Sequence, residues 1–225
     1  MPASDDIIGR YFRGDQGPLD FMQYSQWLAT IETAEYYNQH ARTARAFPNK
    51  NQLHKWAMSQ RPPAMGLHLE FGVASGKTIN LIASCTKERV YGFDTFTGLP
   101  EDWRTGFAGG AFDQRGNLPE VSENVELIAG LFEDTLPPFM AKHGADKIAY
   151  LHVDCDLYSS SVTIFKNCVD RLVSGSIVVF DEYWNYGGWQ HDEFKAFQEF
   201  VEFSGVSYSY IGFVPSSQQV AVRIN

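Results

Sequence analysis

The sequence predicts an α/β fold built on one mostly parallel sheet of seven strands, one of them antiparallel, with helices on both faces and further helices at the N-terminus. From residue 66 onward, short strand-like runs alternate with helical patterns, as expected for repeated βα units. Residues 176–180 form a continuous apolar run, typical of a strand buried on both faces. The last two strands are joined by a short Pro-Ser-Ser connection, so they must be antiparallel neighbours.

The composition indicates a packed globular protein. The 225 residues suit one sizeable α/β domain, and 44% of them are hydrophobic while 20% are charged. A net charge of −9 argues against an extended nucleic-acid surface, which requires clustered Lys and Arg. The three widely spaced cysteines support neither a disulfide framework nor a zinc site, so reduced thiols are expected.

Residues 1–64 are expected to form a helical cap and oligomerisation segment, and residues 65–225 the α/β domain. Apolar side chains at helical spacing predict one or two amphipathic helices within residues 19–47: Phe21, Tyr24, Trp27, Leu28 and Ile31. A short helix over residues 51–59 ends at Arg61-Pro62-Pro63. The aromatic stripe favours a homo-oligomer, with a dimer as the simplest form.

The sequence offers no sign of a membrane protein. Residues 1–17 contain no apolar segment of the kind found in signal peptides, and no stretch approaches the roughly 20 apolar residues of a membrane span. A cytoplasmic location and no membrane partner are therefore expected.

The predicted elements of the domain follow one another closely along the chain. Parallel strands are expected at residues 65–71, 89–93, 125–129, 147–153 and 176–180, and helices at 76–86, 133–142, 160–172 and 190–203. Strands at 207–213 and 218–224 complete the sheet. Because such sheets bind ligands outside the carboxyl ends of their strands, the polar residues after each strand are the candidates for function. Residues 95–124, rich in glycine and aromatics, are expected to form a substrate-side loop that orders on binding.

The first candidate site is the run Glu70-Phe71-Gly72-Val73-Ala74-Ser75-Gly76-Lys77-Thr78, which ends the first strand and opens a helix. Its glycines allow a sharp turn and close approach to a ligand. Only three residues separate Gly72 from Gly76-Lys77, one fewer than a P-loop requires, and the dinucleotide spacing G-x-G-x-x-G is absent. S-adenosylmethionine is the third option, because Glu70 could interact with a cationic ligand. Strand-to-helix packing alone could also explain the turn.

Acidic residues follow three further strands. Asp94 ends the second strand, where it could accept hydrogen bonds from ribose hydroxyls or cap the following turn. Two carboxylates in His152-Val153-Asp154-Cys155-Asp156 and two in Asp181-Glu182 follow neighbouring strands and would converge. Like charges so placed repel one another, and a divalent cation relieves the conflict. Oxygen-only ligands favour Mg²⁺, with Ca²⁺ or Mn²⁺ as alternatives.

Together these motifs resemble the macrocin O-methyltransferase (TylF-like) family. The resemblance rests on Glu70-Phe71-Gly72, on residues 92–100 (GFDTFTGLP), on residues 152–158 (HVDCDLY), and on Asp181-Glu182-Tyr183 with Gly188-Trp189 and residues 193–197. It covers roughly residues 65–225. It implies a Rossmann-like class I methyltransferase fold, S-adenosylmethionine as the methyl donor, and Mg²⁺-dependent O-methylation of a small-molecule hydroxyl, commonly on a sugar of a natural product.

The resemblance also implies roles for individual residues. Asp154, Asp181 and Glu182 would bind the metal. The cofactor would contact Glu70, Gly72, Ser75, Gly76, Thr78, Asp94 and, near the adenine, Phe132. Glu182 is one methylene longer than the Asp or Asn that related enzymes use. The candidates for accepting the proton, or otherwise acting in catalysis, are His152, Asp154, Asp156 and His191.

Two other function classes are compatible with this fold. A catalytically silent S-adenosylmethionine or nucleotide sensor would keep the turn and Asp94 but would need no acidic cluster. A nicotinamide-dependent oxidoreductase is disfavoured by the spacing of the turn. Within the methyltransferases, a metal-dependent enzyme acting on a phenol or catechol is the alternative to one acting on a sugar.

Overall fold

The computed structural model describes residues 20–62 and 66–225. The sequence predictions for residues 1–17, and the boundary placed between residues 64 and 65, fall outside these ranges. The division of the chain into a cap and a domain therefore stays a prediction. None of the described helices combines the length and the apolar composition that crossing a bilayer requires.

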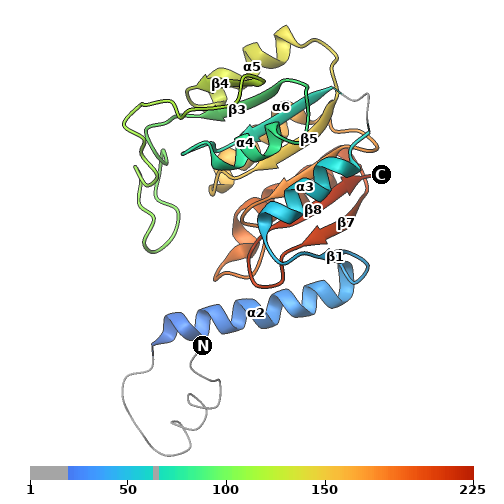
Figure 1. The fold of residues 1–225 in the computed structure, drawn as a ribbon. Coiled ribbons are helices and arrows are strands. Elements are labelled where there is room, and N and C mark those ends of the chain that lie inside the picture. The colour runs from blue at the N-terminus through green and yellow to red at the C-terminus, as the bar shows by residue number, and fades with distance from the viewer. Residues whose placement is uncertain (1–19, 63–65) are drawn as a thin grey trace, which may run out of the picture.

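The described chain folds around one eight-stranded sheet with the order β1-β7-β8-β6-β5-β2-β3-β4 (Figure 1). Five parallel strands run from the middle of the sheet to one edge: β2 (Leu67–Phe71), β3 (Val90–Asp94), β4 (Val125–Ala129), β5 (Ile148–Val153) and β6 (Ile177–Phe180). Strand β8 (Val220–Ile224) pairs antiparallel with both β6 and β7 (Tyr208–Phe213), and every other pairing is parallel. The predicted α/β fold with one antiparallel strand is thus confirmed.

One short strand was not predicted. Strand β1 (Arg45–Ala46) pairs with β7 at the edge of the sheet and raises the number of strands from seven to eight. Two residues are too few to produce a hydrophobic period, so only its position beside β7 makes it a strand. The N-terminal segment therefore contributes to the sheet as well as to the helices around it.

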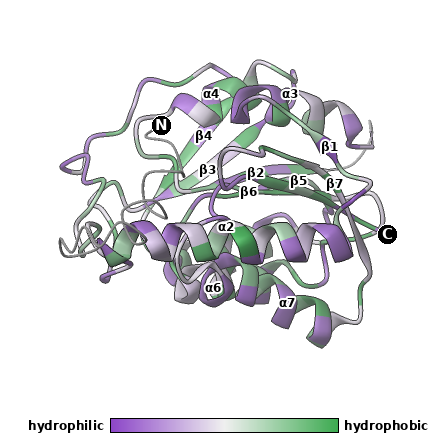
Figure 2. Ribbon diagram, turned by 90° about the horizontal axis from the view of Figure 1, so that it is seen from below, coloured by the Kyte–Doolittle hydropathy of each residue, from purple (hydrophilic) through white to green (hydrophobic). Residues whose placement is uncertain are grey.

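Helices cover both faces of the sheet (Figure 2). On one face lie α3 (Lys50–Gln60) and α4 (Lys77–Ala83), and on the other lie α5 (Phe132–Lys142), α6 (Tyr158–Cys168) and α7 (Glu193–Ser204). Every residue of β2, β5 and β6 is consequently buried. Burial on both faces explains why β6 is apolar throughout.

One helix prediction needs correction. The helix expected over residues 190–203 is divided into a 3₁₀ turn, Trp189–His191, and α7, because Asp192 between them has φ −104° and ψ −123°. Residues 20–47 contain one helix, α2 (Phe21–His40), in agreement with the prediction of one or two, and it lies along the edge of the molecule (Figure 1). Most of its predicted apolar stripe stays exposed, because α2 packs on the rest of the protein through residues such as Ala29, Tyr36 and Tyr37.

The alternation of side chains along β2 and β5 separates apolar from polar groups. Leu69 and Phe71 of β2 join the core under α5–α7, so Glu70 between them points to the face covered by α3. In β5, Leu151 and Val153 join the same core, and His152 points to the α3 face. Glu70 and His152 are direct neighbours across the two strands. The sheet thereby places two ionisable groups in the interior, beneath α3.

Candidate active site

A cavity of about 650 Å³ opens at the carboxyl ends of the parallel strands. This is the position and the size expected of a small-molecule site in an open α/β sheet. Its wall includes the turn after β2, the end of β3, the loops after β5 and β6, and residues 95–112 of the long loop. The predicted site residues that line it are Gly72, Ser75, Thr78, Asp94, Phe132, Asp154, Asp156, Asp181 and Glu182.

The glycine turn (residues 72–76) links β2 to α4 with three residues at positive φ: Gly72 at 92°, Ala74 at 43° and Gly76 at 77°. A Cβ atom on Gly72 would lie 1.7 Å from the carbonyl oxygen of Asp154, so no larger residue fits there. The turn therefore packs directly against the backbone that follows β5. This close approach brings the two predicted halves of the site together.

Asp94 holds the glycine turn in place. Its Oδ2 accepts hydrogen bonds from the backbone N–H groups of Val73 and Ala74, both at 2.8 Å, and its Oδ1 accepts one from Phe96 at 2.7 Å. The carboxylate thus lines the cavity and supports the turn at the same time. The predicted capping contact is present, and the ribose contact stays a prediction.

Two of the predicted cofactor residues do not line the cavity. Glu70 is fully buried, with Oε1 3.3 Å from Nδ1 of His152, and Gly76 faces Pro119 and Glu120 behind the turn. By contrast, Phe132 lines the cavity at the start of α5, where its ring packs edge-on against Phe71 at 5.2 Å. Glu70 can therefore act on a ligand only through His152 or the turn.

The carboxylate cluster (Asp154, Asp181 and Glu182) also lines the cavity. One oxygen from each residue lies within 4.8 Å of the other two. Burial and the neighbouring carboxylates Asp181 and Asp154 raise the pKa of Glu182 well above its ordinary value, and Oε2 of Glu182 is buried without a hydrogen-bond partner. The predicted convergence of these acids is present. Whether they bind a metal stays a prediction.

Asp181 is held in its charged form by two cationic neighbours. Burial alone would raise its pKa, but His152 and Lys50 lower it below the ordinary range. The Lys50 ammonium lies 3.2 Å from both carboxylate oxygens, and Gln219 donates a hydrogen bond to Oδ2 at 3.2 Å. A positive charge therefore already stands beside the cluster.

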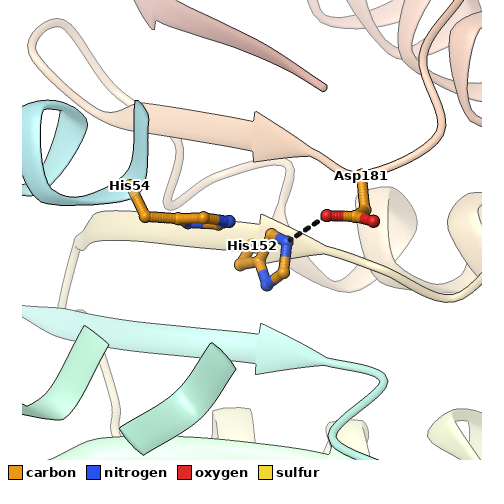
Figure 3. Close-up of side chains that lie close together, drawn as sticks. All are labelled: His54, His152 and Asp181. Atoms are coloured by element: carbon orange, nitrogen blue, oxygen red, sulfur yellow. Dashed lines mark ion pairs between the residues drawn. The ribbon is translucent and has the colours of Figure 1, made fainter. Parts of the chain in front are cut away.

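The candidate proton acceptors occupy different positions. Asp156 lines the cavity at a positive φ of 63°, and burial raises its pKa to about 7 against the opposing effect of Arg104. His152 is fully buried behind the cavity wall, with Nε2 3.8 Å from Oδ1 of Asp181 (Figure 3). His191 is exposed in the 3₁₀ turn and does not line the cavity.

The long loop also contributes to the cavity. All of residues 95–124 are described, and they contain no helix or strand beyond an isolated bridge between Arg104 and Phe107. The Arg104 guanidinium lies 3.8 Å from the ring centre of Trp103 and 4.6 Å from that of Tyr186. These stacking contacts fix a positive charge in the wall. The expectation that the loop orders on binding stays a prediction.

Three residues near the site were not predicted. Lys50 and His54 come from α3, and Glu193 comes from the start of α7, where it is fully buried. The Glu193 carboxylate accepts hydrogen bonds from the backbone N–H groups of Cys155 at 3.4 Å and Glu182 at 3.2 Å, so it joins the loops after β5 and β6. The motif at residues 193–197 contained Glu193, but its spacing gave no sign of this contact.

Comparison with known proteins identifies the domain. A family model described as a methyltransferase domain matches residues 69–183, slightly more than half of the chain. The matched segment extends from β2 to the residues after β6, and so contains the glycine turn and the carboxylate cluster.

Two curated relatives from Streptomyces match part of the chain. The 8-demethyl-8-(2,3-dimethoxy-α-L-rhamnosyl)-tetracenomycin-C 4′-O-methyltransferase of Streptomyces olivaceus is 29% identical over 119 residues, covering 44% of this chain and 43% of the relative. The demethyldecarbamoylnovobiocin O-methyltransferase of Streptomyces niveus is 30% identical over 108 residues, covering 40% of each chain. The chain spans about two fifths of the length of these relatives.

A solved structure resembles the whole fold. The crystal structure of the calicheamicin methyltransferase CalS11 superposes with a TM-score of 0.60 at 19% identity, and the match covers 92% of this chain and 94% of that one. At this level of identity the likeness shows a shared architecture.

Proposed function

Because the chain belongs to the methyltransferase-domain family, we propose that it transfers a methyl group from S-adenosylmethionine to a hydroxyl group of a small molecule. The observation that carries the proposal is that the glycine turn and the carboxylate cluster line a single cavity. A donor site and an acceptor site are needed side by side for direct transfer. A catalytically silent sensor would need no acceptor site.

The cavity wall fits S-adenosylmethionine. Backbone groups of the glycine turn, with Ser75 and Thr78, can hold the methionine part, whose carboxylate suits the start of α4. Asp94 is available to a ribose hydroxyl while it supports the turn, and Phe132 offers an aromatic face to the adenine.

The donor set of the carboxylate cluster fits a divalent cation such as Mg²⁺. Three carboxylates converge within 4.8 Å, and the buried Oε2 of Glu182 lacks a partner. A bound cation would lower the pKa of an acceptor hydroxyl and orient it toward the methyl group. Asp154, Asp181 and Glu182 would hold the ion, while Glu193 keeps the loops after β5 and β6 at a fixed separation.

Asp156 is the best-placed group to accept the hydroxyl proton. It lines the cavity, and a pKa of about 7 suits a base that works near neutral pH. His152 lies behind the wall and His191 lies outside it, so neither can reach an acceptor in this structure. The carboxylate oxygens of Asp156 would take the proton and release it to water after transfer.

A sugar hydroxyl of a natural product is the acceptor class we propose, as in the macrocin-like family. The name of the Streptomyces olivaceus relative supports this choice, because it specifies a rhamnosyl derivative of tetracenomycin C as the substrate. The Streptomyces niveus relative is named as an O-methyltransferase of demethyldecarbamoylnovobiocin. Arg104, stacked on Trp103 in the loop that lines the cavity, would contact such an acceptor. A phenol or catechol could use the same cluster, so both acceptor classes belong in a first screen.

We also propose that two copies associate through α2. Phe21, Trp27, Leu28 and Ile31 of this helix are 40–74% exposed, and large apolar side chains exposed together on one helix favour a protein–protein contact there. Light scattering should give twice the mass of one chain, and the double variant Leu28→Glu/Ile31→Glu should give a monomer. A monomeric parent protein would refute the association.

Calorimetric titration with S-adenosylhomocysteine, in Mg²⁺ and in chelator, tests the main proposal. We expect micromolar binding, and we expect a Ser75→Trp variant, whose side chain would fill the turn side of the cavity, to bind at least about tenfold more weakly. Folded protein that binds no S-adenosylhomocysteine in either condition would contradict the proposal. Binding would be followed by an acceptor screen of deoxysugar glycosides and catechols.

A further inference from the structure

Buried polar atoms without hydrogen bonds are concentrated beneath the carboxylate cluster. Within residues 20–62 and 66–225, nine buried side-chain nitrogen and oxygen atoms lack a hydrogen-bond partner, and five of them belong to His54, Glu70 and His152. All three residues are fully buried. Two of the five, Nδ1 of His152 and Oε1 of Glu70, lie 3.3 Å apart as an ion pair, which leaves Oε2 of Glu70 and the Nε2 atoms of His54 and His152. Buried atoms of this kind are costly to leave unpaired and favour an additional occupant.

The side chains of His54, His152 and Asp181 meet at this place. They come from α3, from β5 and from the residue that follows β6, and one ligand atom of each lies within 4.8 Å of the others. Nε2 of His152 lies 3.8 Å from Oδ1 of Asp181, and the His54 ring points toward both (Figure 3). Donor atoms of a tetrahedral metal site stand about 3.4 Å apart, so sub-ångström shifts of the side chains would close the group around an ion.

The outer contacts of the two histidines leave the same nitrogen free on each. Nδ1 of His54 lies 2.7 Å from the Tyr150 hydroxyl, and its Nε2 has no partner. Nδ1 of His152 lies 3.3 Å from Oε1 of Glu70, and its Nε2 faces Asp181. A metal ion bound at Nε2 would take the place of the proton that cationic His152 holds there, and that proton would be released to water. Metal-binding histidines are oriented in this way, with one nitrogen on a carboxylate or hydroxyl and the other on the ion.

We propose that His54, His152 and Asp181 bind a divalent first-row transition metal in a second site, next to the oxygen site and sharing Asp181 with it. Imidazole nitrogens select such metals, whereas Mg²⁺ and Ca²⁺ prefer oxygen ligands. Asp181 lines the cavity while the two histidines lie behind it, so the ion enters past Asp181. The proposal stands independently of the methyl-transfer activity.

Co²⁺, whose absorption bands report its ligands, is the probe. Metal-free protein in excess Mg²⁺ is titrated with Co²⁺, and we expect one tightly bound Co²⁺ per chain that Mg²⁺ does not displace. The variant His54→Asn keeps an amide near the position of Nδ1, for Tyr150, but lacks Nε2, and it should bind Co²⁺ at least about tenfold more weakly. Glu182→Gln, which alters only the oxygen site, should keep the Co²⁺ spectrum.

Two results would overturn the proposal: no Co²⁺ binding in excess Mg²⁺, or equal binding by the parent protein and His54→Asn. Binding of S-adenosylhomocysteine checks that the variant is folded. Should the variant fail to fold, proton NMR of the Co²⁺-loaded parent protein decides the matter. Two strongly shifted, exchangeable imidazole N–H signals, from Nδ1 of His54 and His152, support the site, and their absence excludes it.

Discussion

The glycine turn and the carboxylate cluster line the same cavity but differ in how their polar groups are hydrogen-bonded. Around the turn, three backbone N–H groups donate hydrogen bonds to the Asp94 carboxylate, so the protein itself stabilises this charge. In the cluster, burial and the charge of Asp181 raise the pKa of both Asp154 and Glu182, and Glu182 keeps a buried oxygen without a hydrogen-bond partner. The turn is complete without a ligand, whereas the cluster is not.

This difference indicates which part of the site depends on an added ion. A preformed turn needs no ordering when the cofactor binds, which lowers the cost of binding. Carboxylates that repel one another store unfavourable energy that a cation releases. We therefore expect cofactor binding to tolerate chelators, and methyl transfer to be sensitive to them.

The largest expected effect comes from breaking the cluster. Asp181→Asn removes the charge that Lys50 and His152 surround, and should lower metal-stimulated turnover by about a thousandfold, since a metal contributes several kcal/mol to such reactions. Turnover is measured with and without Mg²⁺, together with S-adenosylhomocysteine affinity, which should change little. Glu202→Gln, an exposed carboxylate on α7, is the matched control. Full turnover by the Asp181→Asn variant in the presence of a chelator would show that the cluster has no catalytic role.

A smaller effect is expected from the turn. In Asp94→Asn, an amide NH₂ must face at least one of the N–H groups of Val73, Ala74 and Phe96, and hydrogen bonds to charged groups are worth about 1.5–3 kcal/mol. Affinity for S-adenosylhomocysteine should fall about ten- to a hundredfold while metal affinity stays the same. Calorimetry measures both. A parallel loss of metal affinity would show that the two regions are coupled.

The site residues that directly follow the parallel strands could be predicted from the sequence. The carboxyl ends of neighbouring parallel strands meet at one edge, so the convergence of Asp154 with Asp181 and Glu182 follows from two apolar runs and the residues after them. Lys50 and His54 could not be found in this way. They reach the site because Leu53, Ala57 and Met58 pack α3 onto the sheet, and this docking leaves no periodic signal linking α3 to β5 or β6.

The contacts of a polar residue were harder to predict than its position. Glu70 stands at the end of β2 as expected, but alternation along the strand turns its carboxylate into the interior, toward His152, rather than into the cavity. The helix over residues 190–203 was expected to be continuous. It breaks at Asp192, whose Oδ2 accepts hydrogen bonds from Trp103 and Tyr186, and these partners lie outside any local pattern.

Two buried histidines show how nearby carboxylates and burial compete to set the pKa of an imidazole. In His152, contacts with Asp181 and Glu70 outweigh burial and raise the pKa to about 10, whereas in His68 burial and Arg61 lower the pKa to about 4. The folded pKa of His68 lies below the unfolded value of about 6.5, so the unfolded chain binds the proton first. The contribution of neutral His68 to the free energy of unfolding is complete above pH 6.5 and is lost as the pH falls toward 4.

The variant His68→Gln, which keeps an acceptor for the Arg61 Nε–H, isolates this contribution. Between pH 6.5 and 4, the free energy of unfolding of the parent protein should fall, relative to the variant, by about 1.4 kcal/mol per pH unit at most. Urea unfolding at several pH values measures the difference, in which other titrating groups cancel. A parent protein that gains stability relative to the variant at low pH would mean that His68 is charged when folded.

The smallest expected effect concerns Lys50, which stands beside the cluster as the protein's own cation. Its ammonium lies 3.2 Å from both oxygens of Asp181, and its side chain is 41% exposed, so water weakens the pair. Lys50→Met keeps the length of the side chain and removes the charge, and should strengthen Mg²⁺ binding by about three- to tenfold because a competing cation is gone. Lys77→Met, which removes a lysine from the turn side of the same cavity, is the control and should leave Mg²⁺ affinity unchanged. Weaker Mg²⁺ binding in Lys50→Met would show instead that Lys50 holds Asp181 in the position that binds the ion. The cluster would then depend on α3 for its geometry as well as for its charge.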